Sequence, residues 1–193
     1  KIKSTTRIHN YFFIKSVDKL KEGGVLAFIT TSMFSDSPGN KEIREYLMDK
    51  ADLIDVVRLP DHVFAESGTR VSADVVVMRK NSKTQLVSER ENDFIRSINV
   101  KLKGADGVDA EVPMNDYLNK RPAKILGDLV SDGQYGNSQA VARSREPLKE
   151  VYQRLSQTLS NGYQKNDGIT VEQANDKPVD ARPALVSGRV LID

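Results

Sequence analysis

The chain has 193 residues, enough for one domain with a hydrophobic core and some further segment, and its formal net charge of +2 gives no overall basic field that would indicate nucleic acid. Cysteine is absent, which excludes disulfide scaffolds and thiolate metal sites and suits a reducing cytoplasm. No apolar run approaches the roughly 20 residues that span a bilayer, and the sequence starts at Lys1 without a signal-peptide pattern. We therefore expect a cytoplasmic protein and an interior piece of a longer chain.

The first predicted element is an amphipathic helix that begins near His9. Phe13, Val17 and Leu20 recur at spacings of four and three residues, which is the spacing of a core-facing stripe. Phe12 lies about 100° from Phe13 around the helix axis and faces a more polar edge. One aromatic ring is therefore expected to point inward and the other to lie outside the core.

A glycine turn and a strand follow this helix. Gly23 suits the left-handed residue just after a helix end. The apolar run 25–29 shows no alternation, which is typical of a strand buried on both faces of a parallel sheet. The polar stretch 30–32 then ends the strand at the edge where α/β sheets bind ligands. Capping of the strand end is the favoured interpretation of these hydroxyl side chains.

A helix over 41–51, with Ile43 and Leu47 inward, precedes predicted strands over 53–59 and 73–79. The connections up to the second strand suit a parallel, right-handed α/β layer. No helix separates the last two strands, so these should be antiparallel neighbours. The predicted fold is an α/β sheet with an antiparallel last strand, followed by a polar accessory segment.

The second half of the chain has a weaker pattern. Residues 81–113 are polar apart from a short apolar patch at 94–98, and residues 127–141 are rich in turn residues without an assignable role. A proline at the first turn and an apolar stripe predict a helix from Pro147 to Leu159. We therefore divide the chain into a first unit over 1–80, an accessory or linker segment over 81–160 and a weakly ordered tail or linker over 161–193.

Two segments, FFIKSVDKLKEGGVLAFITTSMF and LPDHVFAESGTRVSADVVVMRK, carry a resemblance to a known family. Their order resembles the C-terminal half of the class I (Rossmann-like) S-adenosylmethionine-dependent methyltransferases, specifically the adenine-specific DNA methyltransferases. The similarity covers about residues 8–80. It is greatest to the methylases of large bacterial proteins, often carried by phages or conjugative elements, that join the methylase to helicase-like modules. Restriction-modification is the biological setting that this resemblance implies.

The resemblance implies S-adenosylmethionine as cofactor and an adenine swung out of DNA as substrate. By position in the family pattern, Phe12 would lie against the adenine ring of the cofactor, and Phe64 would stack on the target adenine. Stacking on an aromatic ring is worth about 1–3 kcal/mol per base, which offsets much of the cost of extracting it. The alternative for each residue is simple packing: Phe12 against a neighbouring helix, and Phe64 as a cap on the sheet edge. His62 receives no role.

The catalytic part of the family pattern is absent. The chain contains neither the Asn-Pro-Pro-aromatic nor the Asp-Pro-Pro-aromatic motif, and no glycine-rich turn follows a first strand. The resemblance thus implies that both features lie in an upstream half of the same domain and that this chain alone does not transfer methyl groups. No catalytic residue and no metal ligand is assigned. Two alternatives remain: a non-catalytic module that positions DNA on a degenerate methylase fold, and a fragment of another doubly wound enzyme such as a reductase.

Overall fold

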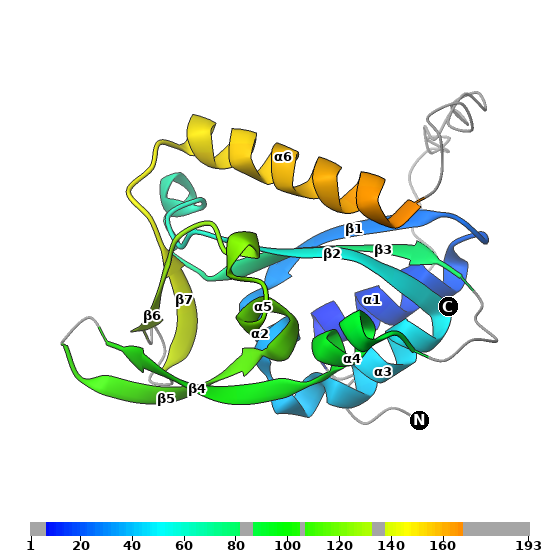
Figure 1. Cartoon of the computed structure of the whole chain (residues 1–193), viewed down its shortest axis with the longest axis horizontal. Helices are drawn as coiled ribbons and strands as arrows, with labels where there is room; N and C mark the ends of the chain where they lie inside the picture. The colour runs from blue at the N-terminus through cyan, green and yellow to red at the C-terminus, as the bar shows by residue number, and fades with distance from the viewer. Residues whose placement is uncertain (1–6, 82–86, 105–106, 133–137, 168–193) are drawn as a thin grey trace, which may run out of the picture.

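The computed structural model describes residues 7–81, 87–104, 107–132 and 138–167. Its centre is a three-stranded sheet in the order β1 (Val25–Thr31), β3 (Ala73–Lys80), β2 (Ala51–Leu59) (Figure 1). β3 is antiparallel to both neighbours, so β1 and β2 run in the same direction with β3 between them. The expected antiparallel pairing of the last two strands is confirmed. The first two strands share a direction, as in the predicted parallel layer, but they are not adjacent.

β1 differs from its predicted environment. We expected burial on both faces, but its residues alternate between covered and exposed, and the side chains of Val25 and Ile29 are 44% and 61% exposed. In the described part of the chain, β1 pairs only with β3 and forms one edge of the sheet. An apolar run therefore identified the strand correctly, while its degree of burial depends on which elements cover it.

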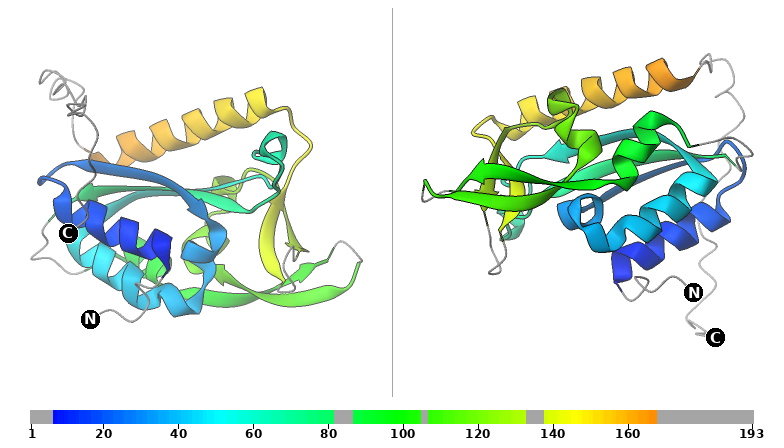
Figure 2. Two further views of the ribbon diagram at one scale, coloured as in Figure 1. Left: turned by 180° about the vertical axis from the view of Figure 1, so that it is seen from behind. Right: turned by 60° about the horizontal axis from the view of Figure 1, so that its bottom comes forward.

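Helices α1 (Ile8–Lys19), α3 (Lys41–Lys50) and α4 (Glu89–Ile95) cover one face of this sheet (Figure 2). The predicted stripe of the first helix is confirmed, since Phe13 and Val17 are buried and Leu20 packs against the same core cluster. The ring of Phe13 stacks on that of Phe34 with a centroid distance of 4.0 Å. Aromatic packing thus fixes α1 onto the segment that follows β1.

The turn between α1 and β1 requires glycine at two successive positions. Gly23 has a φ of +76°, the left-handed conformation that its place after the helix predicted. A Cβ on Gly24 would lie 2.9 Å from the carbonyl oxygen of Lys21, closer than a side chain tolerates. The backbone N–H of Gly23 donates to the carbonyl of Lys80, which ties this turn to the end of β3.

Short helical turns follow β1 and β2, the two strands that run in the same direction. α2 (Ser32–Asp36) and the 3₁₀ turn η2 (Pro38–Asn40) lead from β1 into α3, and η3 (Ala65–Ser67) lies in the loop after β2. Asn40 occupies the N-cap position of α3, but its amide donates to the carbonyls of Met33 and Phe34 instead of capping the helix.

Arg44 connects the α3 layer to the next part of the chain. This fully buried arginine donates hydrogen bonds to the carbonyls of Phe34, Ser37 and Ile95 and to the hydroxyl of Ser97, at 2.8–3.2 Å. Burial lowers its pKa to about 10. Because the guanidinium is surrounded by acceptors from three elements, it holds α2 and α4 at a fixed distance.

Two hairpins follow α4, and the sequence analysis did not predict them. The first joins β4 (Ser97–Lys103) to β5 (Asp109–Asn115), and the second joins β6 (Asp128–Asp132) to β7 (Gln139–Arg143). α5 (Asp116–Asn119) and η4 (Pro122–Lys124) connect them. In β4 and β5, side chains pack on the core at every second position, with charged residues between them. That alternation gives the segment its low mean hydropathy although it forms part of the core.

The opposite face of the central sheet is covered by α6 (Leu148–Asp167), which lies along β2 (Figure 1). The predicted late helix is confirmed and extends eight residues beyond its expected end at Leu159. Val151 is buried, and Leu148, Leu155 and Leu159 pack on a second core cluster formed with β2 and β3. The proposed division at residue 80 stays a prediction, and residues 168–193 of the expected tail lie outside the described part of the chain.

Candidate functional site

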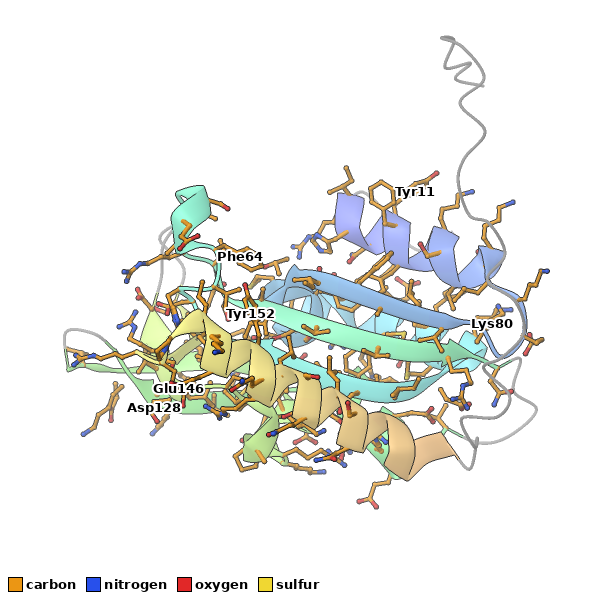
Figure 3. All side chains as sticks on the ribbon, turned by 90° about the horizontal axis from the view of Figure 1, so that it is seen from above. Tyr11, Phe64, Lys80, Asp128, Glu146 and Tyr152 are labelled. Atoms are coloured by element: carbon orange, nitrogen blue, oxygen red, sulfur yellow. The ribbon has the colours of Figure 1, made fainter. Side chains whose placement is uncertain are left out.

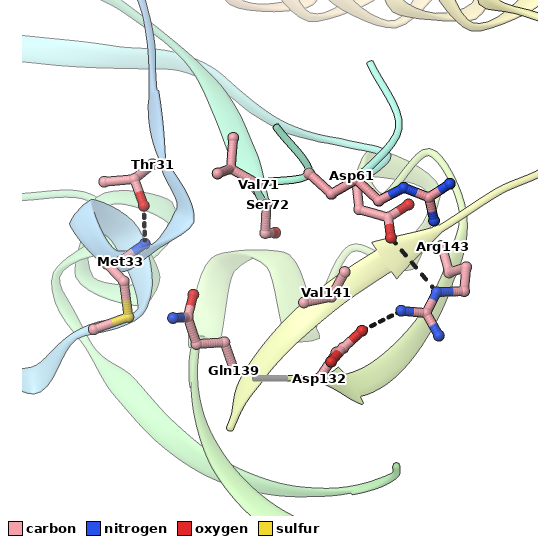
Figure 4. A pocket seen from close by; sticks show the side chains of 10 residues that line it. Thr31, Met33, Asp61, Val71, Ser72, Asp132, Gln139, Val141 and Arg143 are labelled. Carbon is pink, nitrogen blue, oxygen red and sulfur yellow. Dashed lines mark hydrogen bonds and ion pairs between the residues drawn. The ribbon is translucent and has the colours of Figure 1, made fainter. Parts of the chain in front are cut away.

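A cavity of about 390 Å³ opens where β1 and β2 end and β3 begins (Figure 4). Since β1 and β2 run in the same direction, their carboxyl ends share this edge of the sheet, which we call the carboxyl edge. The cavity is of the size that binds small organic ligands in proteins. Its lining comes from β1 and α2, from the loop after β2, and from the β6–β7 hairpin: Thr31, Met33, Asp61, Arg70, Val71, Ser72, Asp132, Gln139, Val141 and Arg143.

The walls of this carboxyl-edge cavity combine apolar surfaces with a few polar groups. Met33, Val71 and Val141 contribute the apolar surface, and the amide of Gln139 faces the interior between Met33 and Val141 (Figure 4). Arg143 pairs with Asp61, with 3.5 Å between Nε and Oδ2, and also with a carboxylate of the hairpin. The opposing charges hold the hairpin against the loop after β2.

A buried ion cluster lies at the same edge. Arg58 of β2 donates from Nε to Asp74 of β3 at 2.8 Å and from Nη2 to Asp36 of α2 at 2.8 Å. Its Nη1 donates to the carbonyl of Ala140 in β7 at 3.2 Å. Asp36 also accepts from the backbone N–H of Asn115 at 2.9 Å. One guanidinium therefore joins the central sheet, α2 and the hairpin that lines the cavity.

The charges of this cluster do not balance, because two carboxylates share one arginine. Burial raises the pKa of Asp36 to about 6, against the opposing attraction of Arg58, and the neighbouring charge of Asp74 raises it further. The two carboxylates raise the pKa of Arg58, so it stays protonated at any physiological pH. Two carboxyl groups and one guanidinium thus lie together at the carboxyl edge, and none of the three lines the cavity.

A second cavity of about 400 Å³ adjoins the first and shares Asp61, Arg70 and Arg143 with it. His62, Ser144 and Arg145 complete its lining. His62 Nε2 lies 3.0 Å from the carbonyl oxygen of Glu146, so the ring is used in joining this loop to the segment before α6. The two cavities therefore lie next to each other at the carboxyl edge.

The first of the two aromatic residues singled out from the sequence, Phe12, lies on α1. Its side chain is 52% exposed, compared with 1% for Phe13, which confirms that the two neighbours face different surroundings. The Phe12 ring contacts Tyr11 edge to face at 5.8 Å. The side-chain amide of Asn10, in the first turn of α1, donates to Asn40, in the turn that follows β1 and α2, at 2.9 Å. The start of α1 therefore lies at the carboxyl edge.

Phe64, the second predicted aromatic, lies in the loop after β2 at the carboxyl edge. It is half-buried and packs on the second core cluster, and Figure 3 places it beside the start of α6, near Tyr152. α1 and α6 cover opposite faces of the sheet (Figure 1). No ring contact joins Phe12 and Phe64 in the described residues, and neither lines a cavity described above. The functional roles predicted for both residues stay predictions.

The hydroxyl-rich end of β1 has a structural role. The Oγ1 of Thr31 accepts a hydrogen bond from the backbone N–H of Met33 at 3.4 Å and so caps the first turn of α2. The backbone N–H of Ser32 donates to the carbonyl of Ser72 at 2.9 Å, which joins the end of β1 to the start of β3. The capping interpretation is confirmed for Thr31 alone, because the buried hydroxyls of Thr30 and Ser32 have no hydrogen-bond partner among the described residues.

Two groups of functional interest were missed in the sequence. Arg58 and Asp74 each stand next to a run of valines in the predicted strands, and that pattern could have indicated a buried ion pair. Gln139 stands in a turn-rich segment with no periodic pattern, and nothing in its neighbours indicates that it faces a cavity. Its position depends on the pairing of β6 with β7, which brings it opposite Asp132.

The packing of helices on both faces of this sheet defines an α/β protein, and the cavity lies at the edge where such proteins often bind ligands. The family of N-6 DNA methylases matches residues 3–120, and the chain belongs to that family. Over 76 residues it is 34% identical to the defense against restriction protein B of Escherichia phage P1, which corresponds to 39% of this chain and 3% of that protein. The chain thus spans only a small fraction of this relative. No solved structure matches it. In the part of the chain that the structure describes, no helix is long and apolar enough to cross a membrane.

Proposed function

We propose that this chain is the C-terminal part of a class I, Rossmann-like methyltransferase domain that moves a methyl group from S-adenosylmethionine to the exocyclic amine of adenine in DNA. The Asn-Pro-Pro-aromatic motif of such an enzyme would lie in an upstream half of the domain. The family match supports the general activity. The observation that carries the proposal is that the start of the helix bearing Phe12, the loop bearing Phe64 and the carboxyl-edge cavity all lie at one edge of the sheet.

The outer edge of β1 supports placement as a C-terminal half. In the described residues this edge has no strand partner, and Val25 and Ile29 of β1 are largely exposed. An unpaired strand edge with apolar side chains favours pairing with another strand. An upstream strand of the same domain, with its helix, would cover both the edge and these side chains. The partner that the proposal requires is therefore the N-terminal half of the methylase domain.

The residues present fit only part of a donor site. The exposed rings of Tyr11 and Phe12 provide an aromatic surface of the kind on which an adenine ring packs. S-adenosylmethionine, when bound, supplies an electrophilic methyl group on sulfonium. The groups that would hold its methionine end belong to the upstream half in this proposal. Phe12 is therefore a positioning residue for the donor in the proposed site.

The substrate side would use the loop after β2. An enzyme that acts on a base amine must take the base out of the duplex and hold it against a surface. Phe64 is fixed by its packing on the second core cluster, so its ring orientation is determined before DNA binds. With the domain completed, a base held there would present its exocyclic amine to the methyl group that a bound donor would supply.

A non-catalytic function is the second candidate. The similarity to a phage protein named for defense against restriction favours it. A degenerate methylase fold could position DNA or another protein without transferring methyl groups. The two candidates differ in one measurable property, which is methyl transfer by the longer protein.

The test is the transfer of labelled methyl groups from S-adenosylmethionine to adenine-containing duplex DNA by the longer protein that contains this chain. We expect label in N6-methyladenine and none with residues 1–193 alone. A duplex in which every adenine is already N6-methylated is the matched control. Lack of transfer to any unmethylated duplex, with a folded protein that binds DNA, would favour the non-catalytic function and reject the proposed enzyme.

A further inference from the structure

Part of the carboxyl-edge cavity comes from residues beyond the family match. Asp132, Gln139, Val141 and Arg143 belong to the β6–β7 hairpin, whereas the match ends at residue 120. We propose that this hairpin is the element of the chain that recognises a DNA base, with Gln139 bonding to the edge of an adenine in the cavity. Arg70 and Arg145 hold the adjoining phosphates. This inference rests on the proposed function, because it assumes that DNA is the substrate.

Gln139 has the chemistry and the freedom to contact a base. In the described part of the chain its amide makes no side-chain hydrogen bond, although it is half-buried and faces the cavity (Figure 4). A glutamine amide offers one acceptor and two donors. It pairs with adenine through two hydrogen bonds, to N7 and to the N6 amine, and each such pair gives a strong preference over other bases.

The rest of the cavity suits a flat, largely apolar ring. Met33, Val71 and Val141 supply apolar surface at its walls. The hydroxyls of Thr31 and Ser72 are already used, since the first caps α2 and the second donates to the carbonyl of Ala140 at 3.4 Å. The faces of a base would therefore contact side-chain carbon and sulfur, while its polar edge would turn toward the Gln139 amide.

The hairpin holds Gln139 in a fixed place. The carbonyl of Ala140, the next residue, accepts from the buried Arg58 at 3.2 Å. The carbonyl of Ala142 accepts from the backbone N–H of Asp61 at 2.9 Å, and the Asp61 carboxylate pairs with Arg143. The backbone that carries Gln139 is therefore fixed before binding, while its side-chain amide is free to turn toward a base.

Two arginines next to this cavity are available for phosphates. Arg70 and Arg145 both line the second cavity, both are exposed, and neither forms an ion pair with another described residue. Arg143 differs, because two carboxylates already hold it. Arginine binds phosphate oxygens through its planar, two-pronged guanidinium, and such contacts fix the register of a nucleic acid without reading its sequence.

The test uses residues 1–193 and single-stranded oligothymidylates with a fluorescent label, carrying one central adenine, guanine, cytosine or thymine. Fluorescence anisotropy gives the affinity for each. We expect tightest binding with the central adenine, and a Gln139→Ala variant should lose about 5- to 10-fold of that preference while its affinity for the all-thymine strand stays the same. Gln153→Ala, which removes an exposed glutamine amide on α6, is the matched control and should change nothing.

The arginines predict a different pattern. Arg70→Ala and Arg145→Ala should weaken binding to all four strands by the same factor. Each should also reduce the slope of log affinity against log salt by about 0.7, the value for one lost phosphate contact on a single strand. Lys41→Ala is the control for loss of one positive charge, because Lys41 is 60% exposed on α3 and pairs with Glu45.

Gln139→Glu keeps the shape of the side chain and replaces its donors with acceptors, so it should move the preference from adenine to cytosine. If Gln139→Ala does not fold, the base preference of Gln139→Glu tests the inference in its place. Adenine preference that survives both substitutions overturns the inference and leaves the proposed methyl transfer untouched. Lack of binding by the native chain to every strand also overturns it, while the labelled-methyl assay on the longer protein independently decides the proposed function.

Discussion

Arg58 and Asp74 lie directly opposite each other on β2 and β3, and two hydrogen bonds of 2.8 and 3.0 Å join their fully buried side chains. The pair stands at the carboxyl edge, and neither residue lines the cavity. Through Asp36 and the carbonyl of Ala140, the same guanidinium also reaches α2 and the β6–β7 hairpin. This arginine therefore couples the stability of the central sheet to the position of the hairpin.

Replacing Arg58 with methionine should strongly destabilise the protein. The substitution keeps most of the side-chain volume but leaves Asp36 and Asp74 buried without their cation, and breaking such a cluster costs about 3–5 kcal/mol. Urea denaturation measures the free energy of unfolding. Arg154→Met is the control, because Arg154 pairs with Glu146 at the surface and such pairs contribute less than about 1 kcal/mol. Equal effects of the two substitutions would contradict a supporting role for Arg58.

The pH dependence of stability should contain a contribution from Asp36. Its pKa is raised to about 6 in the folded protein by burial, while an aspartate in an unfolded chain titrates near pH 4. Between about pH 4 and 6 the folded protein binds a proton that the unfolded chain does not. The contribution of Asp36 to stability therefore falls as pH rises through this window, by up to about 3 kcal/mol, and is constant above it.

Asp36→Asn should remove that contribution, since an amide does not titrate and its oxygen can still accept from Arg58 and from the N–H of Asn115. The measurement is the difference in unfolding free energy between the variant and the native protein at several pH values. Taking the difference cancels the other carboxylates, including Asp93, whose pKa, against the opposing effect of burial, is lowered by hydrogen bonds from Lys120 and Arg121. The variant should gain relative stability from pH 4 to 6, and a difference that is flat across this range would contradict the raised pKa.

The sequence was sufficient for the elements with strong periodic patterns. The stripe of Phe13 and Val17 placed α1 correctly on the core, and the stripe that includes Val151 placed α6. Gly23 located the turn because a left-handed φ follows from its position after a helix. In each case a local rule determines the structure, so no knowledge of distant residues was needed.

The remaining features depend on distant contacts. The insertion of β3 between β1 and β2 follows from long-range pairing, which no local spacing indicates. The β4–β5 hairpin was missed because charged residues on its exposed face mask the apolar alternation of the other face. Gln139 faces the cavity only because β7 pairs with β6 and Arg58 fixes the adjacent carbonyl. The sequence therefore predicted which edge of the sheet carries the candidate site, but it did not predict which residues of the hairpin line the cavity.

Gly127→Ala should disturb the hairpin that lines the cavity. A Cβ at this position would lie 2.6 Å from the carbonyl oxygen of Arg143, so the two strands would have to move apart. We expect a loss of about 1–3 kcal/mol, measured by urea denaturation. Gly39→Ala is the control, because its Cβ would meet only Ser37 Oγ at an ordinary 3.5 Å. Unfolding of both variants at the same urea concentration would contradict the close approach of the Gly127 and Arg143 backbones.

Substitution of the two predicted aromatic residues should separate donor binding from substrate binding. Phe12→Ala should weaken S-adenosylmethionine binding by the longer protein and change stability by no more than about 0.5 kcal/mol, because the ring is 52% exposed. Phe64→Ala should lower turnover with little change in donor affinity, and should cost about 1–2 kcal/mol of stability because the ring is half-buried on the second core cluster. Phe64→Leu retains much of the packing but not the aromatic face, so it should recover stability without turnover.

Calorimetric titration with the donor and the labelled-methyl assay give the two readouts. Loss of donor binding in Phe64→Ala, with normal donor binding in Phe12→Ala, would reverse the assignment of the two residues. Recovery of turnover in Phe64→Leu would mean that Phe64 acts through packing alone.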